Sequence, residues 1–299
     1  MFDLIPTLDC AGRALKLDRP RIFGIVNVTP DSFSDGGLHA SVAAAVAHGL
    51  KLVEEGADAL DVGGESTRPG AQDVSVDVEL ARVLPVIEQL AQRTTVPISI
   101  DTSKPEVMRA AVAAGAGMIN DVFALRREGA LDVAAELRVP VVLMHMQGEP
   151  RSMQEAPHYD DVVAEVRRFL ADRIFACELA GIARSRIVID PGFGFGKNLQ
   201  HNLGLLANLG DFADLGVPVM AGLSRKRMIG ELTGRDPGER QAGSMAAHLL
   251  AAERGAMLVR SHDVAGLRDA LILLQAVHEA SPAPRRVTSP NVPRWPDEE

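Results

Sequence analysis

Polar residues follow short apolar runs at eight places along the chain, and side chains of these types could do chemistry together. The eight residues are Asn27, Asp61, Asp101, Asn120, His145, Asp190, Ser224 and Arg260. Carboxylates and amides bind the polar edge of a heterocycle, and cationic groups hold an anion. The carboxyl ends of the strands in a parallel barrel meet at one face. We therefore interpret the eight residues as one ring around one pocket.

Two of the carboxylates, Asp101 and Asp190, end the apolar sequences ISID and IVID. A buried carboxylate is costly without a partner, and no basic residue adjoins either one in sequence. The partner could be Lys226, or a flat heterocycle whose amino group and ring N–H match a carboxylate. Asn120 adds a donor and an acceptor to the same edge. For Asp61, a ligand contact and a helix cap or turn acid both stay open.

Cationic residues gather after the last two expected strands. The sequence SRKR, residues 224–227, opens a helix-like segment whose backbone N–H groups, together with Lys226, suit an anion. Arg260 and His262 are alternate residues of an expected strand, so they point to the same side and suit a diphosphate. Ser261 between them should point away. Arg227 could pair with a carboxylate or point to solvent.

Two loops have the composition of ligand-binding segments. NVTPDSFSDGG, residues 27–37, combines glycines with Phe33 in the manner of a mobile lid that covers a ligand. ESTRPGA, residues 65–71, offers the Thr67 hydroxyl and the Arg68 guanidinium beside Pro69. A guanidinium fork suits phosphate or carboxylate.

A third loop, DPGFGFGK at residues 190–197, is rich in glycine but lacks the spacing of a phosphate-binding loop. Asn198 follows the lysine where that motif requires Ser or Thr. We expect the glycines to let Phe193 and Phe195 turn over the mouth of a pocket.

The elements that must position these residues follow a regular rhythm of strand and helix. Strands are expected at residues 21–28, 59–64, 96–101, 116–122, 139–146, 186–190, 217–224 and 257–262. Helical periodicity lies between them, for example at 76–93, 159–180 and 264–280. Eight strand–helix units in this order predict an α/β fold, a (β/α)8 TIM barrel, rather than an open doubly wound sheet.

The composition limits the other classes of protein. A chain of 299 residues, 46% of them hydrophobic, suffices for one barrel at 1–280, with a Pro-rich and disordered tail at 281–299. The net charge of −9 predicts no nucleic-acid surface. The two distant cysteines predict a reducing, cytoplasmic location. Apolar stretches shorter than ~18 residues and the lack of a signal sequence predict no membrane partner.

Seven motifs occur along the chain in one order: NVTPDSFSDGG, ESTRPGA, IDTSKP, MINDV, DPGFGFGK, SRK and RSHDV. In this order they resemble the dihydropteroate synthase family of pterin-binding TIM barrels, from Ile22 to the last helix. The resemblance implies a transferase of folate biosynthesis. Its substrates would be 6-hydroxymethyl-7,8-dihydropterin diphosphate and 4-aminobenzoate, and its products 7,8-dihydropteroate and diphosphate. It also implies Mg²⁺ and a homodimer, formed through helices near 244–256.

The resemblance assigns roles to residues of this chain. It assigns the pterin to Asp101, Asn120, Met144, Asp190 and Lys226. It assigns the diphosphate to Arg68, Arg260 and His262, and its Mg²⁺ to Asn27. It assigns 4-aminobenzoate to Phe33, Thr67, Pro69, Phe195 and the backbone after Lys226. It implies that Asp101 favours positive charge on the pterin, that Arg260 and His262 stabilise the leaving group, and that Lys226 is also catalytic.

Three other functions compete with this one. A pterin-barrel methyltransferase that serves a corrinoid would have no use for the anion groups at SRK and RSH. An aldolase would form a Schiff base on Lys226, and borohydride would trap it. A catalytically inactive pterin-binding protein would keep the pocket, and only turnover distinguishes it.

Overall fold

The computed structural model describes residues 6–29, 37–66, 73–149 and 153–280. Four of the predicted site residues lie outside these ranges: Phe33, Thr67, Arg68 and Pro69. The tail predicted at 281–299 also lies outside them. The roles and the disorder assigned to these residues stay predictions.

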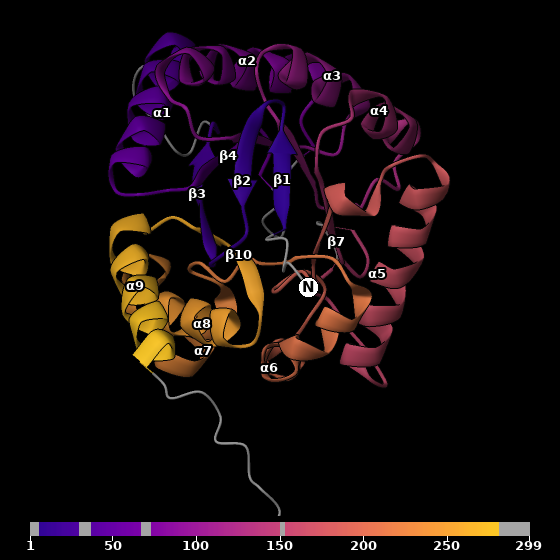
Figure 1. The fold of residues 1–299 in the computed structure, drawn as a ribbon, viewed down its shortest axis with the longest axis vertical. Coiled ribbons are helices and arrows are strands. Elements are labelled where there is room, and N and C mark those ends of the chain that lie inside the picture. The colour runs from indigo at the N-terminus through magenta and orange to yellow at the C-terminus, as the bar shows by residue number, and fades with distance from the viewer. Residues whose placement is uncertain (1–5, 30–36, 67–72, 150–152, 281–299) are drawn as a thin grey trace, which may run out of the picture.

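Eight parallel strands form a closed barrel, which confirms the predicted (β/α)8 fold (Figure 1). The strands are β3 (Arg21–Asn27), β4 (Ala59–Gly63), β5 (Ile98–Asp101), β6 (Met118–Asp121), β7 (Val141–Met144), β8 (Ile187–Asp190), β9 (Val219–Ala221) and β10 (Ala256–Ser261). The last strand pairs in parallel with the first of them, in the register Arg260 to Phe23, and this closes the sheet.

Helices surround the barrel in the order that the rhythm predicts. They are α1 (Gly37–Glu54), α2 (Val76–Arg93), α3 (Pro105–Ala113), α4 (Ala130–Leu137), α5 (Val162–Leu179), α6 (Leu199–Ala207), α7 (Arg227–Thr233), α8 (Gln241–Glu253) and α9 (Val264–Ala280). Short 3-10 turns lie at Arg184–Arg186, Leu209–Leu215 and Pro237–Glu239. Local sequence sets several starts: Pro105 opens α3, and Asp161 caps α5 by accepting from two backbone N–H groups at 3.0 Å.

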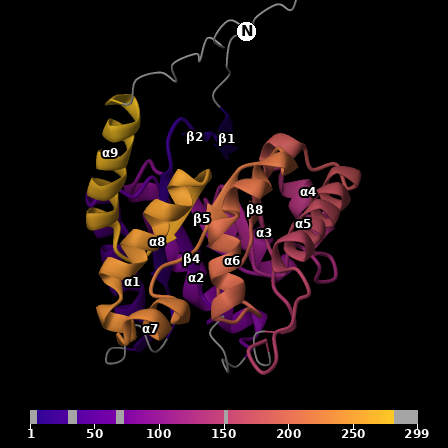
Figure 2. The ribbon, with the colours of Figure 1, turned by 90° about the horizontal axis from the view of Figure 1, so that it is seen from below.

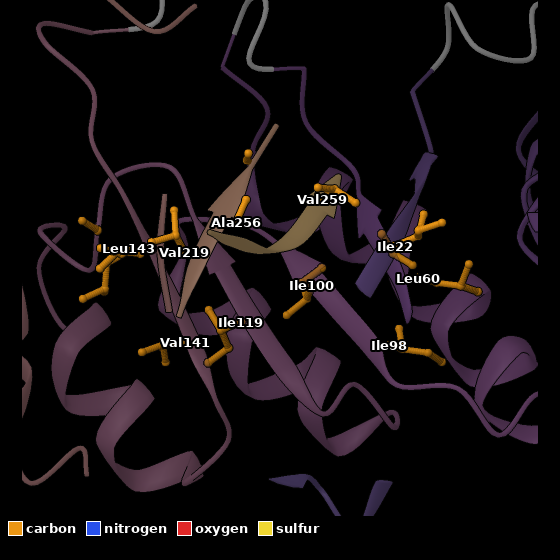
Figure 3. Packing of buried hydrophobic residues seen from close by; sticks show 14 of the residues in the cluster. Ile22, Leu60, Ile98, Ile100, Ile119, Val141, Leu143, Val219, Ala256 and Val259 are labelled. Atoms are coloured by element: carbon orange, nitrogen blue, oxygen red, sulfur yellow. The ribbon is translucent and has the colours of Figure 1, made fainter. Parts of the chain in front are cut away.

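The main core lies between the strands and the helices. Ile22, Leu60, Ile100 and Ile119 point outward from the sheet and are fully buried against the helices (Figure 3). Such β-branched and leucine side chains suit strands that are covered on both faces. Burial of this outer shell fixes which residues of each strand face inward.

A hairpin that the sequence did not reveal closes one end of the barrel. Strands β1 (Thr7–Cys10) and β2 (Arg13–Lys16) pair antiparallel. They lie at one end of the barrel, with α7 toward the other (Figure 2). Leu8 and Leu15 pack against inward-facing barrel residues, and Arg13 donates hydrogen bonds of 2.7 Å to the carbonyls of Ala91 and Val96. Only four residues of alternation in each strand gave too weak a signal to predict it.

The barrel interior has two layers of different chemistry. The layer beside the hairpin is apolar and consists of Phe23, Ala59, Met118, Val142, Val188, Met220 and Leu258. Alternate residues of a strand face the same side, so the next layer is two residues further along each strand. That layer consists of Ile25, Asp61, Asn120, Met144, Asp190, Gly222 and Arg260. The polar groups of this second layer therefore lie directly on the apolar layer.

Of the eight predicted ring residues, Asp61 faces the interior as predicted and His145 does not. Asp61 lies inside β4, two residues before its end, so the interpretation as a cap or turn acid is wrong. His145 follows β7 but packs edge-on against Phe169 of α5, with ring centroids 4.9 Å apart. The ring position predicted for His145 is therefore wrong, and Met144 is the inward-facing residue at this strand end.

Candidate active site

Arg260 joins two carboxylates from other strands. Its Nε donates to Asp61 Oδ2, and its Nη2 donates to Asp101 Oδ2 at 2.7 Å. The partner of Asp101, which the sequence left open between Lys226 and a ligand, is thus an arginine 159 residues away. The three residues belong to β10, β4 and β5, and the closed sheet brings them together.

Asn120 is held by the Asp61 carboxylate that also binds Arg260. Its Nδ2 donates to Asp61 Oδ2 at 3.1 Å. A carboxylate offers acceptors alone, so the amide nitrogen must face Asp61 and the amide oxygen must face elsewhere. Asp61 itself is fully buried, and its Oδ1 has no hydrogen-bond partner among the described residues.

The buried charges alter each other's protonation. Burial raises the pKa of Asp101 to about 7, although the charge of Arg260 lowers it. The neighbouring charges of Asp61, Glu79 and Asp121 raise it further. Burial alone would lower the pKa of Arg260, but the two carboxylates that it bonds raise that pKa above its ordinary value. Arg260 therefore stays charged, while Asp101 can change protonation near neutral pH.

Asp190 ends β8 and faces the same interior layer. Its Oδ1 accepts from the backbone N–H of Gly192 at 2.7 Å. Burial raises the pKa of Asp190, while the Gly192 hydrogen bond and then the charge of Lys226 lower it. One carboxylate oxygen thus fixes the side chain, as in a turn cap, and the other remains an acceptor.

Lys226 lies above this carboxylate, beside an aromatic ring. Its Nζ is 4.3 Å from the centroid of the Phe195 ring, a cation–π distance. Phe195 packs in turn on an apolar cluster that contains Met144. Burial lowers the pKa of Lys226 to about 8, and Asp190 acts in the opposite direction. The structure thus brings together Lys226, Phe195 and Met144, which the sequence assigned to one pocket.

The glycine-rich loop after β8 is supported by a buried lysine that the sequence analysis missed. Lys197 Nζ donates to the carbonyls of Gly192 and Phe195 at 3.0 and 2.9 Å, and lies 2.9 Å from His145 Nδ1. The lysine therefore binds its own loop and is not available to a phosphate. A Cβ atom at Gly192 would lie 1.9 Å from the His145 carbonyl oxygen, which explains the glycine.

Only one of the two phenylalanines of this loop lies near the site. Phe193 is 1% exposed and packs in the outer core, so its predicted place over a pocket mouth is wrong. Phe195 is half-buried and contacts Lys226. Pattern alone did not distinguish them, because both stand between glycines.

The SRK and RSH segments are bonded to each other. Ser224 Oγ accepts from the backbone N–H of His262 at 3.1 Å and lies 2.9 Å from its Nδ1. Arg225 forms two hydrogen bonds with Asp263, at 3.1 and 2.7 Å. Arg227 is exposed and pairs with Glu231 at 2.6 Å. Ser261, between Arg260 and His262, is buried.

A second buried lysine supports the loop after β4. Lys104 Nζ contacts Glu65 at 2.7 Å and the fully buried Glu79 at 2.5 Å. The other carboxylate oxygen of Glu65 accepts from the backbone N–H of Val74 at 2.8 Å. Glu65 therefore fixes residues on both sides of 67–72. Nothing in the sequence indicated this cluster, because its members lie on three different elements.

The fit to a metal ion depends on Asn27. Within the described ranges, no group of three His, Cys, Asp or Glu side chains lies together so as to hold a metal. Asn27 ends β3 and is half-buried. Mg²⁺ keeps most of its water and phosphate ligands and needs few from the protein. One amide oxygen fits a magnesium–diphosphate complex, and does not fit a metal held by protein alone.

A cavity of about 390 Å³ lies elsewhere, beside the hairpin. Its lining includes Lys16, Arg21, Asp58 and Arg268, and none of the residues of the polar layer. Arg21 is already paired with Asp58 at 2.8 Å. The position of this cavity and the ion pair in its lining thus separate it from the polar layer of the barrel.

None of the helices in the described part of the chain is long and apolar enough to cross a membrane.

A buried set of acceptors next to a set of cations defines what the site can do. Asp101, Asn120 and Asp190 suit N–H donors on the edge of a flat ring, and Met144 offers an apolar contact. Lys226 and Arg260 suit carbonyl or anionic groups. This is the pocket of a pterin-binding (β/α)8 barrel, and residues 23–262 match the family described as pterin binding enzyme.

Comparison with individual proteins narrows the class of pterin-binding enzymes to one family. The dihydropteroate synthase of Escherichia coli strain K12 is 53% identical over 269 residues, which cover 90% of this chain and 95% of that protein. The crystal structure of Xanthomonas albilineans dihydropteroate synthase with 4-aminobenzoic acid is 68% identical, with a TM-score of 0.89. A structure of the X. albilineans enzyme with 7,8-dihydropteroate is 66% identical, with a TM-score of 0.85. Each structure covers 93% of this chain and is itself wholly covered. The chain belongs to the dihydropteroate synthase family of transferases.

Proposed function

We propose that this chain condenses 6-hydroxymethyl-7,8-dihydropterin diphosphate with 4-aminobenzoate, releasing diphosphate. The observation that carries the proposal is the polar layer inside the barrel, where Arg260 bonds Asp61 and Asp101 next to Asn120. The related structures with 4-aminobenzoic acid and with 7,8-dihydropteroate support the choice of substrates.

The reaction breaks the bond between the pterin methylene carbon and the diphosphate oxygen, and the electron pair leaves with the diphosphate. The positive charge that develops is shared with the pterin ring. Ionised Asp101 favours that charge, and Arg260 and His262 favour the departing anion. The amine nitrogen of 4-aminobenzoate then bonds the methylene carbon and loses a proton. A neutral arylamine is already nucleophilic, so no side-chain nucleophile is needed.

Phe195 and the backbone after Lys226 frame the second substrate in this proposal, and the Lys226 side chain binds the pterin. The Lys226 Nζ lies 4.3 Å from the centroid of the Phe195 ring, so the pterin and arylamine subsites adjoin at these two side chains. The predicted contributions of Phe33, Thr67, Arg68 and Pro69 belong to the same subsite and to the diphosphate, and they remain predictions.

Mg²⁺ is a further part of the proposal. Asn27 would hold it together with the diphosphate oxygens. When bound, the ion would neutralise charge on the leaving group. Asn27 would hold the ion from the carboxyl end of β3, the strand that pairs with both β10 and β4. Removal of the ion with a chelator is expected to lower turnover without lowering the affinity for free pterin.

We also propose a cytoplasmic homodimer. Large apolar side chains are exposed on three helices that follow one another along the chain: Leu232 on α7, Leu250 on α8 and Ile272, Leu273 and Val277 on α9. These helices lie side by side (Figure 1), and α8 covers most of residues 244–256, through which the homodimer was expected to form.

The proposed cytoplasmic location rests on the cysteines. Free, buried Cys10 and Cys177 suit a reducing compartment.

A coupled assay tests the function. Protein, Mg²⁺ and dihydropterin diphosphate are mixed with or without 4-aminobenzoate, and released diphosphate is measured. We expect release that requires the amine, with dihydropteroate formed in equal amount. Release without the amine, or none at all, would reject the proposal.

The same preparation separates the competing functions. An aldolase would form a borohydride-trappable adduct on Lys226, which the proposal excludes. A corrinoid methyltransferase would transfer a methyl group from a methylated pterin, and an inactive pterin-binding protein would bind pterin without turnover.

A further inference from the structure

Asp61 has no step of its own in the proposed reaction, although it bonds two residues of the site, Asn120 and Arg260. It is fully buried in β4, in the same interior layer as Asn120 and Arg260. One of its oxygens, Oδ2, accepts from Asn120 Nδ2 at 3.1 Å and from Arg260 Nε. A buried carboxylate would be costly if it served only as filling.

The two hydrogen bonds fix the direction of two ligand-facing groups. Because Asn120 gives its amide nitrogen to Asp61, its oxygen is left for a donor, and the described residues form no hydrogen bond to that oxygen. Because Arg260 gives Nε to Asp61, its Nη2 reaches Asp101 at 2.7 Å. Without Asp61 the amide could rotate by half a turn, and the guanidinium could leave Asp101.

We propose that Asp61 is a positioning residue for this reaction: it orients Asn120 as a hydrogen-bond acceptor toward the pterin and holds Arg260 against Asp101. The inference rests on the proposed function and deepens it, since it names which residue sets the acceptor pattern of the pterin pocket. Asp61 acts through its two partners and does not touch the substrate.

Asp61 also shares the charge of one guanidinium with Asp101. The charged groups that face Asp101 are Arg260 from β10, Asp61 from β4, Glu79 from α2, Asp121 from β6 and Lys226, the residue before α7. Among these, Arg260 lowers the pKa of Asp101 and the three acids raise it. Removal of the Asp61 charge leaves Arg260 to Asp101 alone, so the pKa of Asp101 should fall.

Two variants separate positioning from packing. Asp61→Asn keeps an oxygen that accepts from both Asn120 and Arg260 but removes the charge, whereas Asp61→Ala removes both bonds. Binding of free 6-hydroxymethyl-7,8-dihydropterin is measured by calorimetric titration, which needs no turnover. We expect Asp61→Ala to weaken pterin binding by about tenfold or more, and Asp61→Asn to bind within about threefold of the original chain.

The pH profile gives a second readout that a purely structural role would not change. In Asp61→Asn, the acid limb of kcat/KM for the pterin substrate should move to lower pH, while the KM for 4-aminobenzoate stays the same. Ser99→Ala is the control, because Ser99 adjoins Asp61 in the sheet and its buried Oγ has no partner among the described residues. It should match the original chain in both measurements.

Pterin affinity of Asp61→Ala equal to that of the original chain, or an Asn variant as weak as the Ala variant, would overturn the proposal. If Asp61→Ala does not fold, an acid limb that stays in place in Asp61→Asn would overturn it instead. Absence of turnover in the original chain would reject the proposed function, while the titration would still test Asp61.

Discussion

Asp101 and Lys226 carry opposite charges that burial disfavours, so activity should depend narrowly on pH. The pKa of Asp101 is about 7 and that of Lys226 about 8. Below the first value Asp101 is neutral and cannot favour a cation, so the rate should rise as pH increases through about 7. Above the second value Lys226 loses its charge, so the rate should fall. A bell-shaped profile of kcat/KM is expected.

A substitution tests which group sets the alkaline limb. Lys226→Arg keeps a charge at all accessible pH values, so its profile should lose the fall near pH 8, even if its activity is low. A fall that persists in this variant would show that another group causes it. The rising limb serves as the internal control, because Asp101 is unchanged.

Asp190 allows an isosteric test of substrate binding. In Asp190→Asn the amide oxygen can still accept from Gly192 N–H, so folding should be retained. The other carboxylate oxygen of Asp190, an acceptor, becomes an amide donor toward the substrate, and we expect kcat/KM to fall by about 100-fold or more, roughly 2.7 kcal/mol.

Lys226→Ala should likewise abolish condensation with little loss of thermal stability. Near-normal turnover in either variant would contradict the assignment.

At the scale of single residues, the sequence predicted individual residues of the barrel interior better than it predicted which of them form hydrogen bonds with each other. Strand-end position and side-chain type sufficed to select Asp101, Asn120, Asp190 and Arg260. The bond between Arg260 and Asp61 spans 199 residues, and no local pattern carries that distance. Lys104 was missed for a related reason, because its acceptors Glu65 and Glu79 belong to other segments. The role of Lys197 was missed because no pattern shows that the lysine folds back on the carbonyls of its own loop.

At the scale of elements, the hairpin β1–β2 depends on a close approach to β6. A Cβ atom at Gly117 would lie 2.3 Å from the carbonyl oxygen of Cys10. Gly117→Ala should push the hairpin from the barrel and lower the free energy of unfolding by about 1–3 kcal/mol. Urea denaturation measures this change.

Gly204→Ala is the matched control for that substitution. Gly204 lies in α6, and its Cβ atom would lie 3.6 Å from Val162 of α5, an ordinary contact. It should leave the stability unchanged or raise it by about 0.5–1 kcal/mol. Equal stabilities of the two variants would show that the hairpin contributes little.

The loop after β8 gives a second test of an element. Lys197→Met should leave the carbonyls of Gly192 and Phe195 without their donor and destabilise the fold by about 2–4 kcal/mol. Activity should fall too, because the same loop places Phe195 beside Lys226. Thermal unfolding and the coupled assay measure both effects. Normal activity at reduced stability would separate the loop from catalysis.

At the scale of the whole molecule, the exposed apolar surface of α7, α8 and α9 should decide the oligomeric state. Leu250→Glu together with Ile272→Glu places two charges in that surface, and we expect the chain to sediment as a monomer. Phe175→Glu is the control, since Phe175 is 61% exposed on α5, away from these helices (Figure 1). Monomeric behaviour of the unchanged chain would reject the proposed dimer.

The overall architecture was the most predictable level. Eight repeated units specify a closed parallel barrel because each strand is covered on one side by its helix and on the other by the interior. The repetition carries no information about segments outside it. The hairpin before β3 and the short 3-10 turns therefore escaped prediction, although the hairpin determines which end of the barrel is open.

The closed end of the barrel has a kinetic consequence. Because the hairpin and the apolar layer fill one end, every molecule that reaches the polar layer must arrive and depart at the opposite end. A ring bound against Asn120 and Asp190 then sits behind whatever binds next to Phe195. The molecule beside Phe195 should therefore trap the ring bound at Asn120 and Asp190. The ring should exchange with solvent only after the molecule beside Phe195 has dissociated.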